Sequence, residues 1–270
     1  MIGFGNSMFL GTALFSGGGG GGLDPDAQAF ITAAAITNPT QQSAINTLVV
    51  GLKADNLWSK SLVLYPIVGG VSTAHAVNLK SPGTYNMSFS SGWTHSANGM
   101  IGSSAFVNTQ FNPTTAGVNK LNFGMSVYSR TNTSGYKVDI GVVDSVSGSY
   151  SWLVPRYSGS LDFAGSYDDS NFNGNYLTNT LGLMSVVRDS ATTQKLYQSG
   201  VQKGTRTGFS ATADINLNIY FGARNNSNIA MNYSDRQYAF VAIHEGFNAT
   251  EITNFNTRIQ AFQTTLGRQV

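Results

Sequence analysis

Apolar and polar residues alternate in Leu121-Asn-Phe-Gly-Met-Ser-Val127 and again in Ile215-Asn-Leu-Asn-Ile-Tyr-Phe221. A period of two residues places successive side chains on opposite faces of a strand, so each segment predicts a β-strand with one buried face. The segment Tyr238–Ile243 is apolar at every position, which is typical of a central strand covered on both faces. These patterns predict a mainly β protein.

Short turn sequences occur at close spacing in the middle of the chain: Ser134-Gly135, Ser147-Gly148, Ser158-Gly159, Asn173-Gly174 and Ser199-Gly200. Glycine adopts a positive φ without strain, and Ser and Asn side chains bond to the backbone of a turn. Many short strands joined by such turns predict an antiparallel β-sandwich or jelly roll.

Two helix starts precede the predicted strands. In Asp24-Pro25-Asp26-Ala27, Asp24 is a candidate N-cap, Pro25 stands at the first helical position, and the helix is expected to run to about Ala35. The segment Asn38-Pro39-Thr40-Gln41 repeats this pattern, with Gln41 at the capping-box position. Residues 23–57 are therefore predicted to form a helical hairpin that ends near Asn56.

A further helix is predicted at the C-terminal end of the chain. Asn248 and Glu251 have the spacing of a capping box. The apolar residues that follow recur at steps of three and four, which is the period of one helix face; they are Ile252, Phe255, Ile259, Phe262 and Leu266. We expect this face to pack on the sandwich or on a neighbouring subunit.

Six consecutive glycines, Gly17–Gly22, separate the first residues from the rest of the chain. Such a run behaves as a flexible tether. The segment before it is uncharged and partly apolar, and its candidate docking residues are Phe4, Met8, Phe9, Leu10, Leu14 and Phe15. We interpret residues 1–22 as a docking arm with a tether. A loose terminus is the alternative, and the lack of Lys and Arg argues against a signal peptide.

The composition excludes several classes of function. Only 10% of the 270 residues are charged and the net charge is +2, so no basic surface for nucleic acid is expected. The absence of cysteine excludes disulfides, zinc–thiolate sites and thiol catalysis. No apolar run is long enough to predict a transmembrane helix.

The last third of the chain resembles concanavalin A-like, laminin G-like domains in three consecutive segments. The first is Leu183-Met-Ser-Val-Val-Arg-Asp-Ser-Ala-Thr-Thr-Gln-Lys-Leu-Tyr-Gln-Ser-Gly-Val201, which is similar to the signature hairpin of these domains. The second, Ile219-Tyr-Phe-Gly-Ala-Arg-Asn225, resembles their next strand. The third, Phe240–Ile252, resembles their final strand and the short helix after it. The resemblance implies a concanavalin A-like jelly roll over residues 58–270.

A second resemblance concerns function. The segment Trp58–Leu79, the sequence Gly92-Trp-Thr-His95 and the closing Phe262–Val270 resemble laminin G-like proteins encoded by bacteriophages. Those proteins are interpreted as structural components of the virion. The resemblance implies a spike, fibre or decoration protein at the particle surface, whose partners are other virion proteins and copies of itself.

A catalytic site is not expected. Concanavalin A-like glycoside hydrolases use two glutamates on one strand as nucleophile and general acid. The only glutamates here are Glu245 and Glu251, which lie at the predicted junction of strand and helix. The three histidines, His75, His95 and His244, are too dispersed for a metal-binding motif. We therefore predict a non-enzymatic protein without a required cofactor.

One polar segment has the first half of a calcium loop. From Asp169 it reads Asp-x-Asn-x-Asn-Gly, so Asp169, Asn171 and Asn173 are candidate ligands. Laminin G-like domains often hold calcium at the rim of the sandwich, and a weak calcium site is one reading. The other reading, an Asx-rich turn, is favoured because half a motif lacks the charge for tight binding.

Aromatic and amide residues suggest a glycan site near this segment. Lectin-like sandwiches stack sugars on exposed aromatic rings beside Asn, Asp and Gly; the candidate residues here are Trp152, Tyr157, Tyr167, Asn171, Asn173 and Tyr176. The alternative is that these rings are core and cross-strand residues. Tyr150 and Trp152 share one face of a strand, and the sequence leaves open which face is buried.

Three functions remain. The first is a phage virion structural protein that displays a lectin-like sandwich and binds host-surface glycans. The second is an extracellular carbohydrate-binding module that is not part of a virion. The third is a hydrolase on a jelly-roll scaffold, which would need a carboxylate pair that the sequence does not visibly supply. We favour the first.

Overall fold

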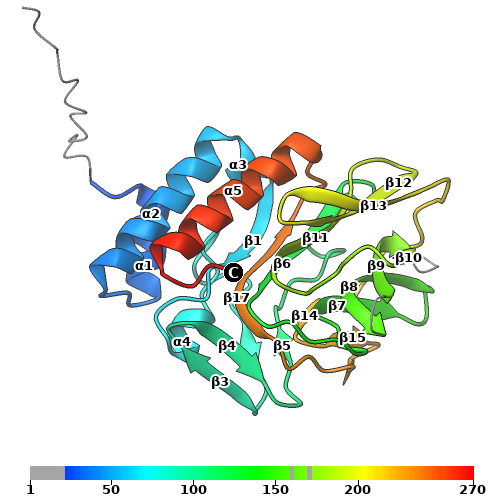
Figure 1. Ribbon diagram of the computed structural model, residues 1–270, viewed down its shortest axis with the longest axis horizontal. Helices are drawn as coiled ribbons and strands as arrows, with labels where there is room; N and C mark the ends of the chain where they lie inside the picture. The colour runs from blue at the N-terminus through cyan, green and yellow to red at the C-terminus, as the bar shows by residue number, and fades with distance from the viewer. Residues whose placement is uncertain (1–21, 159–160, 169–171) are drawn as a thin grey trace, which may run out of the picture.

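The computed structural model describes residues 22–158, 161–168 and 172–270. Within these residues two β-sheets pack face to face, and a layer of helices lies on the outer side of one of them (Figure 1). The helices are α1 (Pro25–Ala33), α2 (Pro39–Ala54), α3 (Leu57–Lys60), α4 (Ser72–His75) and α5 (Ala249–Thr265). The predicted fold class, a β-sandwich with N-terminal helices and a C-terminal helix, is confirmed.

Side-chain caps start the three long helices where the sequence placed them. The Asp24 carboxylate accepts a hydrogen bond from Asp26 N, and the Asn38 side chain accepts one from Gln41 N. Asn248 and Glu251 form the complete capping box of α5. At α2 the box is only half formed, because Gln41 Oε1 accepts a hydrogen bond from Gly69 N instead of returning to its own helix.

The first sheet runs in the order β13-β12-β11-β6-β17-β4-β3, with β1 also paired to β17. Its strands are β1 (Ser61–Tyr65), β3 (Trp93–Ser96), β4 (Gly99–Gly102), β6 (Phe123–Ser129), β11 (Gly182–Arg188), β12 (Thr193–Gln198), β13 (Val201–Thr207) and β17 (Gln237–His244). Strand β17 lies inside this sheet and is buried along nearly its whole length, which confirms the central strand predicted at Tyr238–Ile243.

The second sheet runs in the order β10-β9-β8-β7-β14-β5-β2. A short hairpin, β15–β16, extends it, since β15 pairs in parallel with β7. The strands are β2 (Ser88–Phe89), β5 (Val107–Asn108), β7 (Ile140–Asp144), β8 (Ser149–Ser158), β9 (Leu161–Asp168), β10 (Phe172–Gly174), β14 (Tyr220–Phe221), β15 (Arg224–Asn226) and β16 (Ile229–Met231).

Two local predictions are wrong. The alternating segment 215–221 forms a strand only at Tyr220–Phe221. Ile215 and Ile219 do point into the core, but the backbone bonds at isolated points, such as Ile219 N to Phe111 O at 3.0 Å. Asn173-Gly174 lies within β10 and is not a turn between strands. The alternating pattern predicted which face of the segment is buried, but it held no information on whether a neighbouring strand is present to pair with it.

Three apolar clusters divide the molecule into layers. One lies between the sheets, and a second joins α1, α2 and α5 to the outer side of the first sheet, through residues such as Leu52, Phe240 and Phe255. The third and smallest, around Trp152, lies on the outer side of the second sheet and contains no helix residue. The helices thus cover one outer face, and in the described part of the chain the apolar cluster on the opposite outer face is built from its own sheet and loops.

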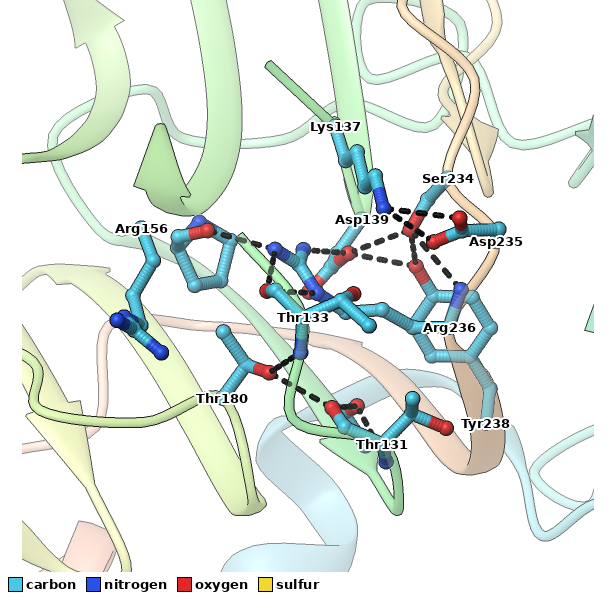
Figure 2. A network of polar contacts seen from close by, with 12 residues as sticks. Thr131, Thr133, Lys137, Asp139, Arg156, Thr180, Ser234, Asp235, Arg236 and Tyr238 are labelled. Atoms are coloured by element: carbon cyan, nitrogen blue, oxygen red, sulfur yellow. Dashed lines mark hydrogen bonds and ion pairs between the residues drawn. The ribbon is translucent and has the colours of Figure 1, made fainter. Parts of the chain in front are cut away.

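A buried polar network ties the two sheets together (Figure 2). Arg236 Nη1 donates to Asp139 Oδ1 at 2.6 Å, and the Tyr238 hydroxyl donates to the same oxygen at 2.5 Å. Arg236 Nη2 also donates to the carbonyls of Thr133 and Pro155, each at 2.8 Å. Burial, reinforced by the Asp139 charge, raises the pKa of Tyr238 far above its usual value, so this hydroxyl remains a donor.

Candidate functional site

The parity of strand β8 decides which of its side chains reach the outer face of the second sheet. Leu153 packs between the sheets, whereas Tyr150, Trp152 and Val154 belong to the cluster on the opposite side. Side chains alternate across a strand, so the three outward positions follow from the one inward position. This settles the face of Tyr150 and Trp152, which the sequence left open.

Two glycines make room for these rings on the sheet surface. A Cβ atom at Gly141, in β7, would lie 2.7 Å from Trp152 Cβ, and one at Gly165, in β9, would lie 2.5 Å from Tyr150 Cε2. Both distances are too short for two carbon atoms. Glycine inside a strand often marks such a close approach, and this was the signal in the sequence that a large ring lies above each position.

Five aromatic side chains form what we call the outer aromatic cluster: Tyr136, Tyr150, Trp152, Tyr157 and Phe163. Neighbouring ring centroids are 4.6 Å apart for Tyr136 and Tyr157, and 4.5 Å apart for Tyr157 and Phe163. These are the spacings of favourable aromatic pairs. Tyr136 is 37% exposed and Trp152 only 6% exposed, so Tyr136 is the ring presented to solvent and Trp152 supports it.

Arg224 lies over the same cluster. Its register partner in the parallel β15–β7 pair is Gly141, which puts its side chain on the outer face above Trp152. Its guanidinium carbon is 5.4 Å from the Trp152 ring centroid and 5.8 Å from that of Tyr136. Nη1 donates to the Tyr136 hydroxyl oxygen at 3.2 Å. Burial raises the pKa of Tyr136, so the hydroxyl keeps its proton for a further contact.

Sequence reasoning found part of this site. Trp152 and Tyr157, both predicted, belong to it; Tyr136, Phe163 and Arg224 were missed. Tyr136 directly follows the predicted turn Ser134-Gly135, and Arg224 lies in the segment Ile219–Asn225, which in the sequence serves only as a fold signature. Neither residue stands beside the other candidates in the sequence, and only the pairing of β15 with β7 brings Arg224 to Trp152.

The prediction of Tyr167 as a rim aromatic is corrected. Tyr167 is 1% exposed and packs edge-on against Phe123 between the sheets, with ring centroids 5.4 Å apart. The register of β8 and β9 shifts here, since Tyr150 faces Asp168 but Trp152 faces Gly165. Tyr167 has a positive φ of 50° at this irregularity, and its side chain turns inward where strict alternation would turn it outward.

The remaining candidates lie elsewhere. Tyr176 is half-buried and packs on Phe172 with centroids 5.2 Å apart, close to Gly204 of β13, so it lies between the two sheets. Asn173 is exposed on β10. Asn171 falls outside the described residues. The described members of the predicted set therefore do not form a single patch: Trp152 and Tyr157 lie together on the outer face, and Asn173 and Tyr176 are in contact elsewhere.

The calcium prediction is not tested by this structure. Asp169 and Asn171 lie outside the described residues, and the third candidate, Asn173, accepts a hydrogen bond from the Tyr176 hydroxyl through its backbone carbonyl. Among the described residues no group of three or more His, Cys, Asp or Glu side chains is placed to hold a metal ion. The fold does bring His75 and His95 together, with their Nδ1 atoms 2.9 Å apart.

Ser126 and His244 form a serine–histidine contact that is buried away from solvent. His244 Nδ1 lies 2.6 Å from the carbonyl oxygen of Glu245, to which it can only donate, so Nε2 accepts from the Ser126 hydroxyl at 2.8 Å. Both residues are 0% exposed, and Phe247 stacks on the imidazole with centroids 4.1 Å apart. Glu251 is used in its helix cap and in an ion pair with Lys60. A substrate has no path to this pair.

Two surface hollows lie elsewhere among the described residues. One, of about 160 Å³, is lined by Leu62, Ala116, Gly117, Val118, Asn119, Asn122 and Glu245. The other, of about 370 Å³, is lined by Thr178, Asn179, Leu181, Gln198, Ser199, Val201, Lys203 and Val270. Both linings are aliphatic and polar, without a ring on which a sugar could stack. No helix in the described part of the chain has the length and apolar character to span a bilayer.

Comparison by sequence gave no relatives: no family model matches the chain, and no curated protein matches it. Comparison of structures did. The chain is similar to botulinum neurotoxin type C, which depends on interaction with two ganglioside molecules to enter cells, with a TM-score of 0.55, 15% identity, and 77% of this chain and 53% of that chain covered. It is also similar to the binding domain of the serotype D neurotoxin, with a TM-score of 0.50 and 11% identity over 74% of this chain and 51% of that chain. An HCR/D mutant has a TM-score of 0.52 and 11% identity over 74% of this chain and 52% of that chain.

The chain spans about half the length of these neurotoxin structures. At such low identity the similarity shows a shared β-sandwich fold alone. What the chain does must therefore be argued from its own side chains.

Proposed function

We propose that this chain is a non-enzymatic, carbohydrate-binding β-sandwich of a bacteriophage particle, displayed at the particle surface as a spike, fibre or decoration component. The observation that carries the binding function is the outer aromatic cluster, whose apolar surroundings contain no helix residue among those that the structure describes. Large aromatic side chains near the surface of a sandwich commonly mark a binding site.

The chemistry of the cluster suits a sugar ring. The face of Tyr136 offers a surface for the C–H groups of a pyranose, and its hydroxyl and the Arg224 guanidinium offer hydrogen bonds to sugar oxygens. Trp152, packed beneath both, holds their positions. Such a site orients a glycan, and among the described residues no carboxylate pair lines the cluster to cleave it.

The layered architecture supports display on a particle. Leu23 packs against the helix-covered core, and Asp24 N donates to Asn46 of α2 at 2.7 Å, so the segment 1–22 joins the fold at the helical layer. The outer aromatic cluster belongs to the opposite sheet (Figure 1). Attachment through the predicted arm would leave the aromatic face turned away from the particle. The virion assignment itself rests on the sequence resemblance, and we expect copies of the chain to assemble together there.

A glycan array tests the binding function. The full chain should retain glycans, with and without calcium, and Tyr136→Ala should abolish retention. Trp58→Ala is the matched control, because Trp58 is a partly buried aromatic of the helical layer. Loss of binding in the control alone, or no retained glycan with the wild-type chain, would exclude this proposal.

The virion assignment has its own test. Mass spectrometry of purified phage particles should detect the chain, and a chain that lacks residues 1–22 should fail to incorporate while still binding glycans. If glycan binding is present but particles never contain the chain, the extracellular carbohydrate-binding module is the correct function. Full incorporation of the truncated chain would disprove the docking arm.

A further inference from the structure

Arg224 carries a positive charge that forms no ion pair with an acidic side chain of the described residues. In the described part of the chain, each carboxylate that lies within 4 Å of a cationic group forms an ion pair with a residue other than Arg224. The contacts of its guanidinium are the two aromatic rings, the Tyr136 hydroxyl and the sulfur of Met231. A cation held over aromatic rings keeps its charge and its hydrogen-bonding capacity toward a ligand.

Acidic residues on or beside the surrounding strands have other partners, and Asp144 of β7 accepts hydrogen bonds from Val146 N and Ser147 N. Asp139 binds Arg236 inside the sandwich, and Asp235 forms an ion pair with Lys137 at 2.7 Å. Asp162 is buried and accepts hydrogen bonds from three backbone N–H groups. The charge left at the outer aromatic cluster is therefore positive.

One edge of the guanidinium is poised for an anion. Nε and Nη2 together form the fork that binds a carboxylate with two parallel hydrogen bonds. Nε is buried and has no acceptor, and Nη2 faces only Met231 Sδ, at 4.0 Å. A thioether is a weak acceptor, and Met231 is exposed and unbranched, so it can move aside.

A second donor without an acceptor lies directly beneath. Trp152 is 6% exposed, and its Nε1 has no hydrogen-bond partner. A buried N–H group without an acceptor is unfavourable. Among the described residues, the cluster thus combines a cation that forms no ion pair with two donors that have no hydrogen-bond partner. A neutral sugar would supply hydroxyls, but a carboxylate would supply both the acceptors and the opposite charge.

We propose that the outer aromatic cluster selects glycans whose sugars carry a carboxylate, such as uronates or sialates. The carboxylate binds the Nε–Nη2 fork of Arg224 in place of Met231 Sδ, and the sugar ring stacks on Tyr136. This inference rests on the proposed carbohydrate-binding function and adds its substrate class. It makes Arg224 the residue that determines specificity, and Tyr136 the residue that provides the general sugar surface.

The test compares matched polysaccharides on one array. Uronate polymers and sialic acid polymers are immobilised in separate wells, each beside a carboxyl-reduced preparation of the same polymer, which keeps the ring and loses the charge. The wild-type chain should bind the acidic forms roughly tenfold or more tightly than the reduced forms. This preference should shrink as salt concentration rises.

Arg224→Gln should remove the preference, so that its residual binding is the same for the acidic and the reduced form of each polymer. Lys203→Gln is the matched control, because it removes a positive charge that lines the larger hollow instead of the cluster, and it should bind like wild type. Binding in either acidic series alone identifies which acid is recognised.

Three results would overturn the inference: equal binding of acidic and reduced polymers, an unchanged preference in Arg224→Gln, or a preference lost in Lys203→Gln. In the first case retained binding that depends on Tyr136 would preserve the proposed function and remove only its acidic specificity. No binding of any polymer would remove both.

Discussion

His75 and His244 are 1% and 0% exposed, and burial lowers their pKa values to about 3 and about 4. Next to His75, the neighbouring His95 and Arg268 further oppose a positive charge. The unfolded chain binds these protons near pKa 6.5. Below that pH the unfolded state holds more protons than the folded state, so the free energy of unfolding is highest above about pH 6.5 and falls as the pH decreases.

When urea unfolding is measured at about pH 7 and about pH 5, the free energy of unfolding should therefore be lower at pH 5, by on the order of 2 kcal/mol for each of these two histidines. Carboxylates with lowered pKa values, such as Asp55 beside Arg258, lose their contribution only at lower pH and do not enter this window. His244→Gln should lose clearly less stability than wild type between the two pH values. Equal stability of the wild-type protein at both would contradict the assignment of neutral, buried imidazoles.

Gly141 is the residue on which the geometry of the outer aromatic cluster depends. Gly141→Ala would put a Cβ 2.7 Å from Trp152 Cβ and 3.1 Å from Val138 Cγ1, and overpacking of this kind costs about 1–3 kcal/mol. We expect a lower unfolding midpoint, altered tryptophan fluorescence and weaker glycan binding. Gly22→Ala, where an added Cβ meets nothing within 4 Å, should leave all three unchanged.

Individual residues show how much of the candidate site could be predicted from the sequence. The sequence identified Trp152 and Tyr157 because they are aromatic and close to a polar segment. It misassigned Tyr167, because the irregularity in the β8–β9 register turns this side chain to the inner face. It missed Arg224, because the parallel pairing of β15 with β7 joins segments about 80 residues apart, and no local pattern encodes such a pairing.

At the scale of the elements, an ion pair joins the residues that directly precede β7 and β17. Its members, Asp139 and Arg236, are both 0% exposed. Removing one partner of a buried pair leaves a charge without compensation, which costs about 3–5 kcal/mol. Asp139→Ala should therefore lower the free energy of urea unfolding by that amount. Asp235→Ala removes a neighbouring but exposed partner of Lys137, and it should cost below about 1 kcal/mol. Similar losses in the two variants would show that burial of the pair is unimportant.

Helices were easier to predict than strands, and the reason is local. Each cap involves residues two or three positions apart, such as Asn248 with Glu251, so the sequence contains the whole interaction. A strand needs a partner from elsewhere in the chain. Segment 215–221 shows this: Ile215, Ile219 and Phe221 are buried as predicted, yet only the last two residues of the segment pair with neighbouring strands.

At the scale of the whole molecule, the helical hairpin and the first sheet share one apolar core. Four side chains of α2 are almost fully buried in it: Ile45, Leu48, Val49 and Leu52. Burying each contributes about 1.5–3 kcal/mol, or roughly 6–12 kcal/mol together, which is comparable to the 5–15 kcal/mol that stabilises a typical domain. The sandwich should therefore depend on the hairpin for its stability.

Two truncations separate the arm from the hairpin. Removal of residues 1–22 should leave the unfolding midpoint and glycan binding unchanged, because the shared core begins at Leu23. Removal of residues 1–56 should produce an aggregating chain, since it would expose Phe240 of β17 and Phe255 and Ile259 of α5 to water. A soluble, cooperatively unfolding product of the longer truncation would instead show that the sandwich and α5 form a stable unit without the hairpin. The hairpin would then not be needed to stabilise the sandwich, and its role would be attachment to the particle.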